Sequence, residues 1–398
     1  MLNQRLDQLT EYPFRRLAQL LEGVKPRANT VPIAMSVGDP QHDPPPLLHE
    51  VLARHAAGWG RYPPMLGLPE FRGACADWLA RRYRLPSGFV DPDHQVLPCA
   101  GTREALFMIA ELAAAECGRG NPPAVLMPNP FYQVYFGAAV MAGAEPVFLP
   151  ATRETGFLPN LDAIPPSVLQ RTALMYLCSP SNPQGAVASL DYLKQAIALA
   201  RRRGFVLAVD ECYSEIYSDG VLPSGALEAC AALGEGCDSV VVFHTLSKRS
   251  SAPGLRSGFI AGDRRIMAAF AKVIPYSAAT MPLPVQFASA ALWGDEAHVE
   301  AARAAYRAKF DVAERVFGGR LGFYRPDGGF FLWLDVGDGE SAARRLWEQA
   351  AIRTLPGAYL ARPDAAGRNP AQSYIRVALV HDLETTALAL RRVDEILA

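Results

Sequence analysis

One lysine in this sequence occupies a position where an amine can do covalent chemistry. Lys248 follows the apolar run Val240–Phe243, which predicts a buried parallel strand, and it lies in a short polar turn rich in hydroxyl groups. The chain contains five lysines against 34 arginines, and Lys248 is the one expected at the carboxyl end of a strand. A lysine that loses its proton through desolvation can form a Schiff base with a carbonyl compound. The alternative is an ordinary solvated lysine in a loop.

Other side chains capable of chemistry are expected at neighbouring strand ends. Asp210 follows a fully apolar run, so its carboxylate needs a cationic or proton-donating partner. Tyr213 comes three residues later, Asn182 lies in a turn flanked by prolines, and Arg256 can pair with a carboxylate. The helix expected to begin after Gly101 presents free N–H groups that suit a phosphate. Taken singly, each has a structural alternative, such as a helix cap at Asp210 or a turn-stabilising amide at Asn182.

Together these groups match the requirements of pyridoxal 5′-phosphate. That cofactor needs an amine for its aldehyde, a carboxylate for its ring nitrogen, donors for its 3′-oxygen and a cradle for its phosphate. The sequence therefore predicts a pyridoxal 5′-phosphate site assembled from strand ends.

The elements that carry these residues alternate between strands and helices. Such alternation predicts a largely parallel α/β sheet, and open sheets of this kind bind ligands at the carboxyl ends of their strands. The predicted strands are 124–127, 146–149, 173–178, 205–209, 240–243 and 258–262, and the predicted helices are 47–58, 69–83, 102–116, 132–142 and 189–203.

The pattern changes after Pro284. A long helical region over 285–318, interrupted at Trp293–Gly294, leads to shorter strands in GGFFLWLDV and YIRVALV and to a final helix. We expect a large domain over residues 47–292 and a smaller α+β domain, made discontinuous because residues 1–46 join residues 293–398.

Composition excludes several classes of protein. The 398 residues carry a formal net charge of −1 with no basic run beyond Arg201–Arg203, so neither nucleic acid nor an anionic membrane is an expected partner. No run of 18 apolar residues predicts a membrane span, and MLNQRLDQLTEYPF lacks the apolar region of a signal peptide. The seven cysteines, Cys117 among them, are odd in number and include no CxxC, which predicts reduced residues of a cytoplasmic protein and no metal site.

Four short motifs carry a resemblance to a known family. SNPQG (181–185), DECY (210–213), TLSK (245–248) and RSGF (256–259) resemble, in order and spacing, the motif series of the class I aminotransferases of fold type I. The resemblance implies a large domain with a mostly parallel sheet sandwiched by helices, plus a smaller α+β domain. It further implies that Lys248 binds the cofactor covalently and that Asp210 pairs with the pyridinium nitrogen. The other implied cofactor contacts are Tyr213 and Asn182 at the 3′-oxygen, Tyr132 stacked on the ring, and Thr245, Arg256, Gly101 and Thr102 at the phosphate.

The same resemblance implies a homodimer with shared active sites. Tyr62 resembles the tyrosine that reaches the phosphate of the neighbouring subunit. Arg376, in YIRVAL, matches the arginine that binds the substrate α-carboxylate, for which a planar guanidinium is suited, and Gly38 would add a backbone N–H. Small amino acids and 2-oxo acids would be the substrates. Lys248, freed from the aldehyde, would move the Cα proton as general acid and base in a ping-pong reaction.

Longer strings suggest a branch of the family. LPCAGTREALF, PNPFYQVY, ECYSEIY and HTLSKRSSAPGLRSGF resemble the N-succinyl-LL-2,6-diaminopimelate aminotransferases of bacterial lysine synthesis, and Arg249–Ser250 is typical of that branch. Such an enzyme uses glutamate and 2-oxoglutarate as its second pair. Arg103 is the residue expected to bind the distal carboxylate, unless it pairs with Glu104 or another nearby acid.

Three other functional classes are also compatible with the sequence. They are an aspartate-, alanine- or aromatic-type aminotransferase, a pyridoxal-phosphate-dependent β-lyase, and a binding or regulatory protein of the same fold.

Overall fold

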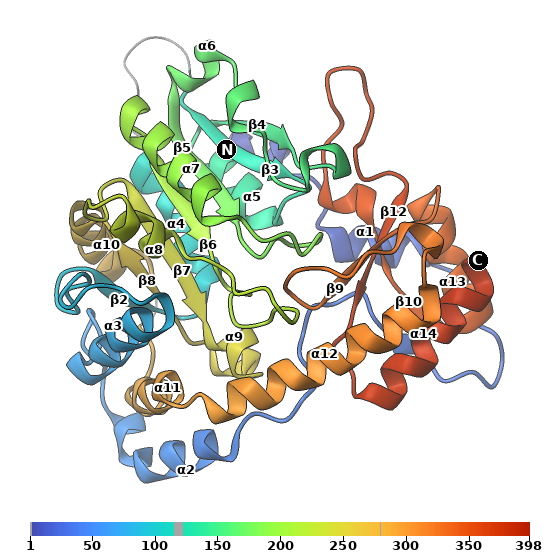
Figure 1. Cartoon of the computed structure of the whole chain (residues 1–398), viewed down its shortest axis with the longest axis horizontal. Coiled ribbons are helices and arrows are strands. Elements are labelled where there is room, and N and C mark those ends of the chain that lie inside the picture. The colour runs from blue at the N-terminus through green and yellow to red at the C-terminus, as the bar shows by residue number, and fades with distance from the viewer. Residues whose placement is uncertain (1, 115–121, 279) are drawn as a thin grey trace.

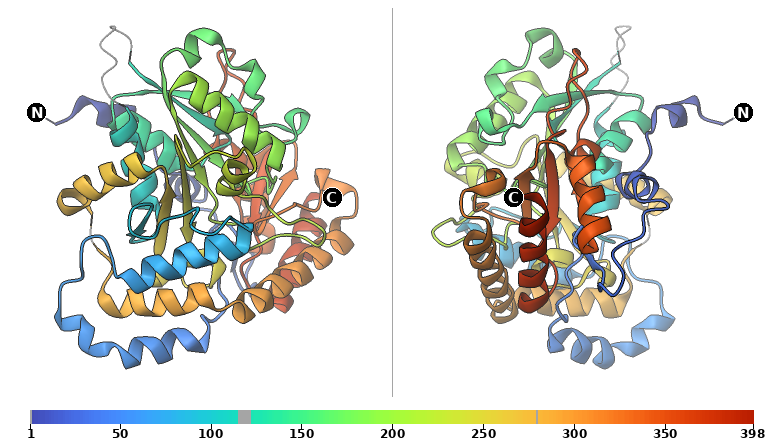
Figure 2. Two further views of the ribbon diagram at one scale, coloured as in Figure 1. Left: turned by 60° about the vertical axis from the view of Figure 1, so that its left-hand side comes forward. Right: turned by 90° about the vertical axis from the view of Figure 1, so that its right-hand side faces the viewer.

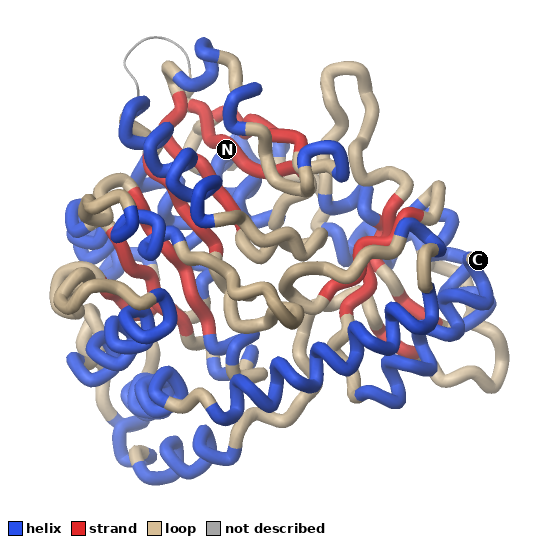
Figure 3. The backbone as a smooth tube through the Cα atoms, viewed as in Figure 1, coloured by secondary structure: helices blue, strands red, loops and turns tan. Residues whose placement is uncertain are grey.

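A seven-stranded sheet forms the centre of the larger part of the molecule (Figures 1 and 3). The computed structural model describes residues 2–114, 122–278 and 280–398. Within the sheet, β8 runs antiparallel to both of its neighbours, and the other four pairs of adjacent strands are all parallel, so the sheet is mostly parallel, as predicted. Its strand order is β2 (Val96–Cys99), β8 (Gly258–Gly262), β7 (Val240–Thr245), β6 (Val206–Asp210), β5 (Thr172–Cys178), β3 (Ala124–Asn129) and β4 (Glu145–Pro150).

Helices cover both faces of this sheet, which explains why its strands are apolar throughout. In β7 every residue is buried, and Val240 and Val242 point into one core whereas Val241 and Phe243 point into the other. The first core is shared with α3 (Pro69–Tyr83), α7 (Leu190–Arg203), α8 (Ala226–Ala232) and α11 (Leu283–Gly294), and α2 (Pro46–Arg54) packs on α11. The second is shared with α4 (Thr102–Ala113), α5 (Gln133–Met141) and α10 (Arg264–Ser277).

A smaller lobe is built mainly from the C-terminal residues (Figures 1 and 2). Its antiparallel sheet has the order β11 (Leu355–Pro356), β12 (Tyr374–Ala378) and β9 (Phe331–Asp335), and β1 (Ile33–Ala34) pairs in parallel with β10 (Ile352–Arg353). The helices of this lobe are α12 (Ala297–Phe317), α13 (Gly339–Ala350) and α14 (Leu383–Leu397). From the other end of the chain, α1 (Pro13–Leu20) packs on β11, because its Leu17 joins Trp333 and Leu355 in one apolar cluster.

Short helices complete the described chain. They are α6 (Pro166–Leu169), α9 (Leu246–Arg249) and the 3₁₀ segments Gln4–Gln8, Ala56–Gly60, Arg153–Thr155, Leu161–Ala163, Pro253–Leu255, Arg320–Gly322 and Gly357–Leu360. Across the described ranges, no helix combines the length and the apolar character needed to span a membrane.

The fold agrees with the sequence prediction in class and in most elements. The predicted helix 102–116 ends at Ala113, and its last residues, like Cys117, lie outside the described residues. The strands β2, β10 and β11 and the helix α8 were not predicted, since they are short and carry little periodicity, and α9 occupies the expected polar turn. The division of domains near residues 46 and 292 stays a prediction.

Candidate active site

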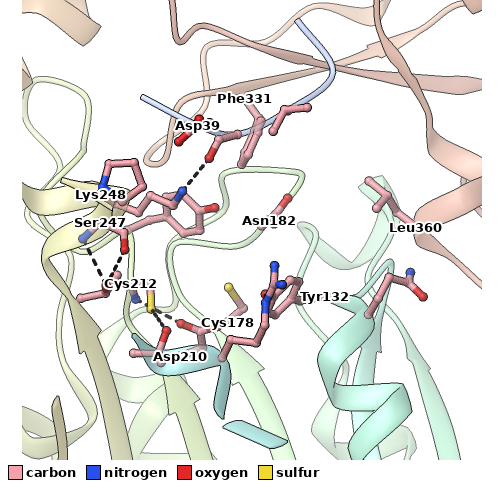
Figure 4. Close-up of a pocket in the computed structure, with 18 of the residues that line it drawn as sticks. Asp39, Tyr132, Cys178, Asn182, Asp210, Cys212, Ser247, Lys248, Phe331 and Leu360 are labelled. Atoms are coloured by element: carbon pink, nitrogen blue, oxygen red, sulfur yellow. Dashed lines mark hydrogen bonds between the residues drawn. The ribbon is translucent and has the colours of Figure 1, made fainter. Parts of the chain in front are cut away.

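The predicted residues meet in a cavity of about 410 Å³ at the carboxyl ends of β5, β6 and β7 (Figure 4). The cavity lies between the two lobes, because its walls also include Gly38, Phe331 and Arg376 from the smaller one. This is the edge at which ligands bind to open α/β sheets. The chain topology therefore gathers residues that are up to several hundred positions apart in sequence.

Lys248 projects into this cavity from α9. The helix begins where β7 ends, and the Thr245 side chain accepts a hydrogen bond from Ser247 N at 3.1 Å as its N-cap. Lys248 Nζ donates to the carbonyl oxygen of Gly38 at 2.5 Å (Figure 4). Burial lowers the pKa of Lys248 to about 8, and the positive charges of Arg376 and Arg256 act in the same direction. An appreciable fraction of the amine is therefore neutral near pH 8.

Asp210 ends β6 at the base of the cavity and is fully enclosed. Its Oδ2 accepts a hydrogen bond from the Tyr135 hydroxyl at 2.7 Å, and its Oδ1 accepts one from Cys212 N at 3.2 Å. Burial raises the pKa of Asp210, and these hydrogen bonds oppose that rise. No arginine or lysine forms an ion pair with Asp210 in the described chain, so its carboxylate is available to a cationic ligand group.

Arg376 and Asn182 are both predicted site residues, and their side chains are in contact. Arg376 Nη1 donates to Asn182 Oδ1 at 3.0 Å, and Nη2 donates to Ser36 O at 2.8 Å. The guanidinium lies over the Phe331 ring at 4.3 Å and is buried, yet none of the described carboxylates pairs with it and its Nε has no partner. Burial lowers the pKa of Arg376 to about 10. A buried cation without an anion is costly, so this guanidinium is available to a carboxylate.

Tyr132 and Arg103 meet on the side of the cavity away from Lys248, where Figure 4 also places Leu360. Arg103 Nε donates to the Tyr132 hydroxyl at 2.9 Å. The expected alternative, an ion pair between Arg103 and Glu104, is absent among the described residues, and the pKa of Arg103 is raised, chiefly by Tyr132. Tyr12 lines the same part of the cavity. Arg103 is therefore a cation held in place by a phenol and not by a carboxylate.

The residues expected at the phosphate end lie where α4 and α9 begin. Thr102, Thr245 and Arg256 all line the cavity, and Thr102 Oγ1 is 3.2 Å from Cys212 Sγ. Gly101 differs from expectation, because its N–H already donates to Cys99 O at 2.7 Å. Its φ of +81° favours glycine there, and a Cβ atom would displace the Arg256 guanidinium. The amides at the start of α4 lack acceptors within the helix and remain the donors for an anion.

Two predicted site residues, Gly101 and Tyr62, do not line the cavity of this chain, and Tyr62 differs from Gly101 in being exposed. The Tyr62 side chain is 100% exposed. Arg249 and Ser250, the residues after Lys248, are buried on the far side of α9 and also do not line the cavity. Whatever they indicate about lineage, they do not contact a bound substrate directly in this arrangement.

Comparison with known proteins identifies the family. Residues 30–393 match the family described as aminotransferase class I and II. The chain belongs to this family. The LL-diaminopimelate aminotransferase of Desulforudis audaxviator is 32% identical over 363 residues, which cover 89% of each chain. Among solved structures, an aminotransferase from Neisseria meningitidis is 40% identical with a TM-score of 0.93 and covers 100% of both chains. Aminotransferase AspB from Helicobacter pylori is 34% identical with a TM-score of 0.89, covering 98% of this chain and 99% of that one.

Aminotransferases of this class use pyridoxal 5′-phosphate, which confirms the predicted cofactor. The side chains of the cavity fit that group. They offer an amine with a lowered pKa, an enclosed carboxylate without a cation, and a helix start next to Arg256. The described residues hold no cluster of three or more histidine, cysteine or acidic side chains that could bind a metal ion.

Several residues of this aminotransferase site were not predicted from the sequence. Tyr135 is the hydrogen-bond partner of Asp210, and Ser247 places a hydroxyl in the cavity beside Lys248. Cys178 and Cys212 also line it, near Asp210 (Figure 4). The spacing of Tyr132 and Tyr135 was the available signal, because residues three apart on a helix share a face.

Proposed function

We propose that this aminotransferase acts on N-succinyl-LL-2,6-diaminopimelate, with 2-oxoglutarate as acceptor, in the synthesis of diaminopimelate and lysine. The products are N-succinyl-2-amino-6-oxopimelate and glutamate. The observation that carries the proposal is Arg103, a cation on the cavity wall away from Lys248 that no described carboxylate neutralises. A substrate with a remote carboxylate supplies the missing partner.

The proposed cofactor contacts follow the geometry of the cavity. Lys248 would bind the cofactor, Asp210 would pair with its ring nitrogen, and Tyr213 and Asn182 would donate to its 3′-oxygen. Asn182 suits this role because Arg376 occupies its amide oxygen, which leaves the NH₂ group to donate. Tyr132 would contact the ring. The start of α4 would hold the phosphate together with Thr245, Ser247 and Arg256, which line the cavity. Bound pyridoxal 5′-phosphate supplies an electron sink for the substrate carbon that loses its proton.

The chain's own groups supply orientation and proton transfer. Arg376, with an amide from Gly38, binds the α-carboxylate and so fixes which face of Cα is presented to Lys248. The Lys248 amine, neutral in part near pH 8, would take the Cα proton and hold it for return, acting as both base and acid. Phe331 and Leu360 contribute apolar surface to the cavity. This arrangement supports a two-stage reaction in which an amino acid and then a 2-oxo acid use the same carboxylate position.

A second candidate substrate is free LL-diaminopimelate, which the name of the Desulforudis relative suggests. The two candidates differ in the distal amine, which is an uncharged amide in the succinyl compound and an ammonium in the free one. A buried or half-buried ammonium needs an anionic partner. The acidic side chains that line the described cavity are Asp39 and Asp210. Asp210 lies at the base of the cavity, and the charge of Asp39 interacts with Lys248. The wall near Arg103 thus favours the acylated substrate.

A panel of amino donors tests this proposal. Initial rates would be measured with N-succinyl-LL-2,6-diaminopimelate, free LL-diaminopimelate, aspartate and alanine, each with 2-oxoglutarate. We expect kcat/KM for the succinyl compound to exceed that of the free diamino acid by about 10-fold or more, given one unpaired charge. Equal kcat/KM values for the two compounds, or a higher value for free LL-diaminopimelate, would contradict the proposed substrate. The membership of the aminotransferase family would not be affected. Pyruvate released from cystathionine would instead indicate a β-lyase.

We further propose a homodimer in which Tyr62 completes the phosphate site of the neighbouring subunit. The fully exposed phenol supports this assignment, because an apolar ring of that size is seldom left in solvent without a partner. Trp59, Met65 and Leu66, which flank Tyr62 in the sequence, are also exposed.

A further inference from the structure

The residue after the active-site lysine is a buried arginine that faces away from the cavity. Arg249 is 3% exposed, and its guanidinium lies over the rings of Trp78, at 5.6 Å, and Trp293, at 5.0 Å. Burial lowers the pKa of Arg249, while the carboxylate of Glu296 opposes that shift. A charge buried this deeply in the molecule costs free energy, so its contacts need an explanation.

The hydrogen bonds of Arg249 all go to the end of α11 and its connection to α12. Arg249 Nη1 donates to Leu292 O at 2.6 Å, and Nη2 donates to Asp295 O at 3.2 Å and to Glu296 Oε1 at 2.7 Å. Leu292 O belongs to the last turn of α11, where carbonyl groups have no partners within the helix. Arg249 therefore caps the C-terminal end of α11 from a different segment of the chain.

Ser250 makes a second connection to the same place. Its Oγ is 2.8 Å from His298 Nε2, and His298 Nδ1 contacts the Asp295 carboxylate. Because the carboxylate only accepts, His298 Nδ1 carries the proton, so Nε2 accepts from the serine hydroxyl. Two consecutive residues thus join α9 to the segment 292–298.

The segment 292–298 joins helices that pack in different lobes. α11 packs against α2 and α3 beside the large sheet, whereas α12 runs on to pack against α14 in the smaller lobe (Figure 1). A change in the angle between the lobes must bend the chain near Asp295 and Glu296, which are the residues that Arg249 holds. α9 has only four residues and carries Lys248, so it has little rigidity of its own.

We propose that Arg249 and Ser250 are positioning residues that couple the α11–α12 junction to Lys248. They fix the direction in which the lysine amine enters the cavity, and they transmit to it any rotation of the smaller lobe. This inference rests on the proposed role of Lys248 but not on the proposed substrate. It gives the Arg249–Ser250 pair a mechanical function, although neither side chain contacts the cavity.

The test compares Arg249→Lys with a matched control. Lysine keeps the charge but has no planar fork to bridge two carbonyls and a carboxylate. The control is Arg303→Lys, which also removes an arginine fork from α12, one that binds Glu215 O and Oε2 at 3.0 Å without touching α9. Both holoenzymes would be assayed with glutamate in the first half-reaction, and the pH midpoint of the cofactor absorbance would be recorded. Hydrogen exchange of residues 246–250 gives a third readout.

We expect Arg249→Lys to lower the half-reaction rate about 10-fold or more, since small misplacements of a reacting group cost rate steeply. The absorbance midpoint should shift and exchange of 246–250 should quicken, while Arg303→Lys leaves all three within about twofold. Unchanged values in Arg249→Lys, or equal changes in both variants, would overturn the proposal. If Arg249→Lys does not fold, Ser250→Ala decides in the same way, because it removes only the contact between the serine hydroxyl and His298. The role of Lys248 itself is tested separately with Lys248→Ala, which should lose the absorbance of the covalently bound cofactor.

Discussion

The Tyr135 hydroxyl donates a hydrogen bond of 2.7 Å to the Asp210 carboxylate, so the acid at the base of the cavity is held by a phenol from α5. Tyr135 is itself fully buried and stacks on Tyr176 with ring centroids 4.4 Å apart. This contact keeps the carboxylate in one orientation, and by stabilising its charged form it offsets part of the pKa rise that burial causes.

Replacement of Tyr135 by phenylalanine should therefore weaken cofactor binding. A hydrogen bond to a charged group contributes about 1.5–3 kcal/mol, which corresponds to an increase of roughly 10-fold or more in the dissociation constant of pyridoxal 5′-phosphate. Tyr176→Phe is the matched control, because that hydroxyl donates to Leu106 O at 2.6 Å and does not contact Asp210. Equal affinities in the two variants, measured by fluorescence titration, would contradict the role of Tyr135.

The reactivity of Lys248 should depend on pH in a defined way. Because burial lowers its pKa to about 8, the neutral amine accumulates as the pH rises through 8, whereas an ordinary lysine needs a pH near 10.4. Protein freed of cofactor should thus show labelling of Lys248 by an amine reagent with a midpoint about two units below that of a solvated lysine. Peptide mapping would compare it with the exposed Lys272 in the same sample. A midpoint near 10 for Lys248 would rule out the lowered pKa.

The same shift has a consequence for stability. A lysine with a lowered folded pKa binds fewer protons in the folded state than in the unfolded chain at pH values between about 8 and 10.5. Its contribution to the free energy of unfolding therefore rises with pH across that window. The penalty of burying the charged amine is present below pH 8.

Arg376 should determine affinity for any substrate with an α-carboxylate. Arg376→Lys keeps a charge but loses the fork that binds a carboxylate through two parallel hydrogen bonds, so kcat/KM for amino acids should fall about 100-fold. Half-reactions with simple primary amines, which have no α-carboxylate, should fall much less. An equal loss for both kinds of substrate would show that the variant damages the site in general, for example through Asn182.

The sequence was most informative where topology alone fixes a position. Lys248, Asp210 and Asn182 each follow an apolar strand, and parallel strands place their carboxyl ends at one edge, so their proximity could be predicted. Contacts that depend on packing between distant segments could not. Arg376 donates to Ser36 O, a residue 340 positions earlier in the chain. The hydrogen bond from Gly101 N–H to Cys99 O depends on a local turn that the spacing of the motifs does not reveal.

Arg103 should discriminate among substrates by their distal charge. Arg103→Gln removes the cation but keeps a polar side chain, so kcat/KM should fall about 10- to 100-fold for N-succinyl-LL-2,6-diaminopimelate and for glutamate. Alanine has no distal carboxylate and serves as the internal control, with an expected change of about twofold or less. A uniform loss that includes alanine would indicate that Arg103 acts by holding Tyr132, whose hydroxyl it contacts at 2.9 Å, and not by binding substrate.

Tyr62 and Lys248 should complement each other between subunits. If the exposed Tyr62 completes the neighbouring site, Tyr62→Ala and Lys248→Ala are each impaired as homodimers, but a mixed dimer contains one site with both residues intact. Unfolding and refolding an equal mixture should restore about a quarter of the wild-type activity per site, because half of randomly formed dimers are mixed and each has one complete site. The separate variants, refolded alone, set the background. Activity of the mixture equal to the mean of the two would show that Tyr62 acts within its own chain or not at all, and the shared site would have to be abandoned.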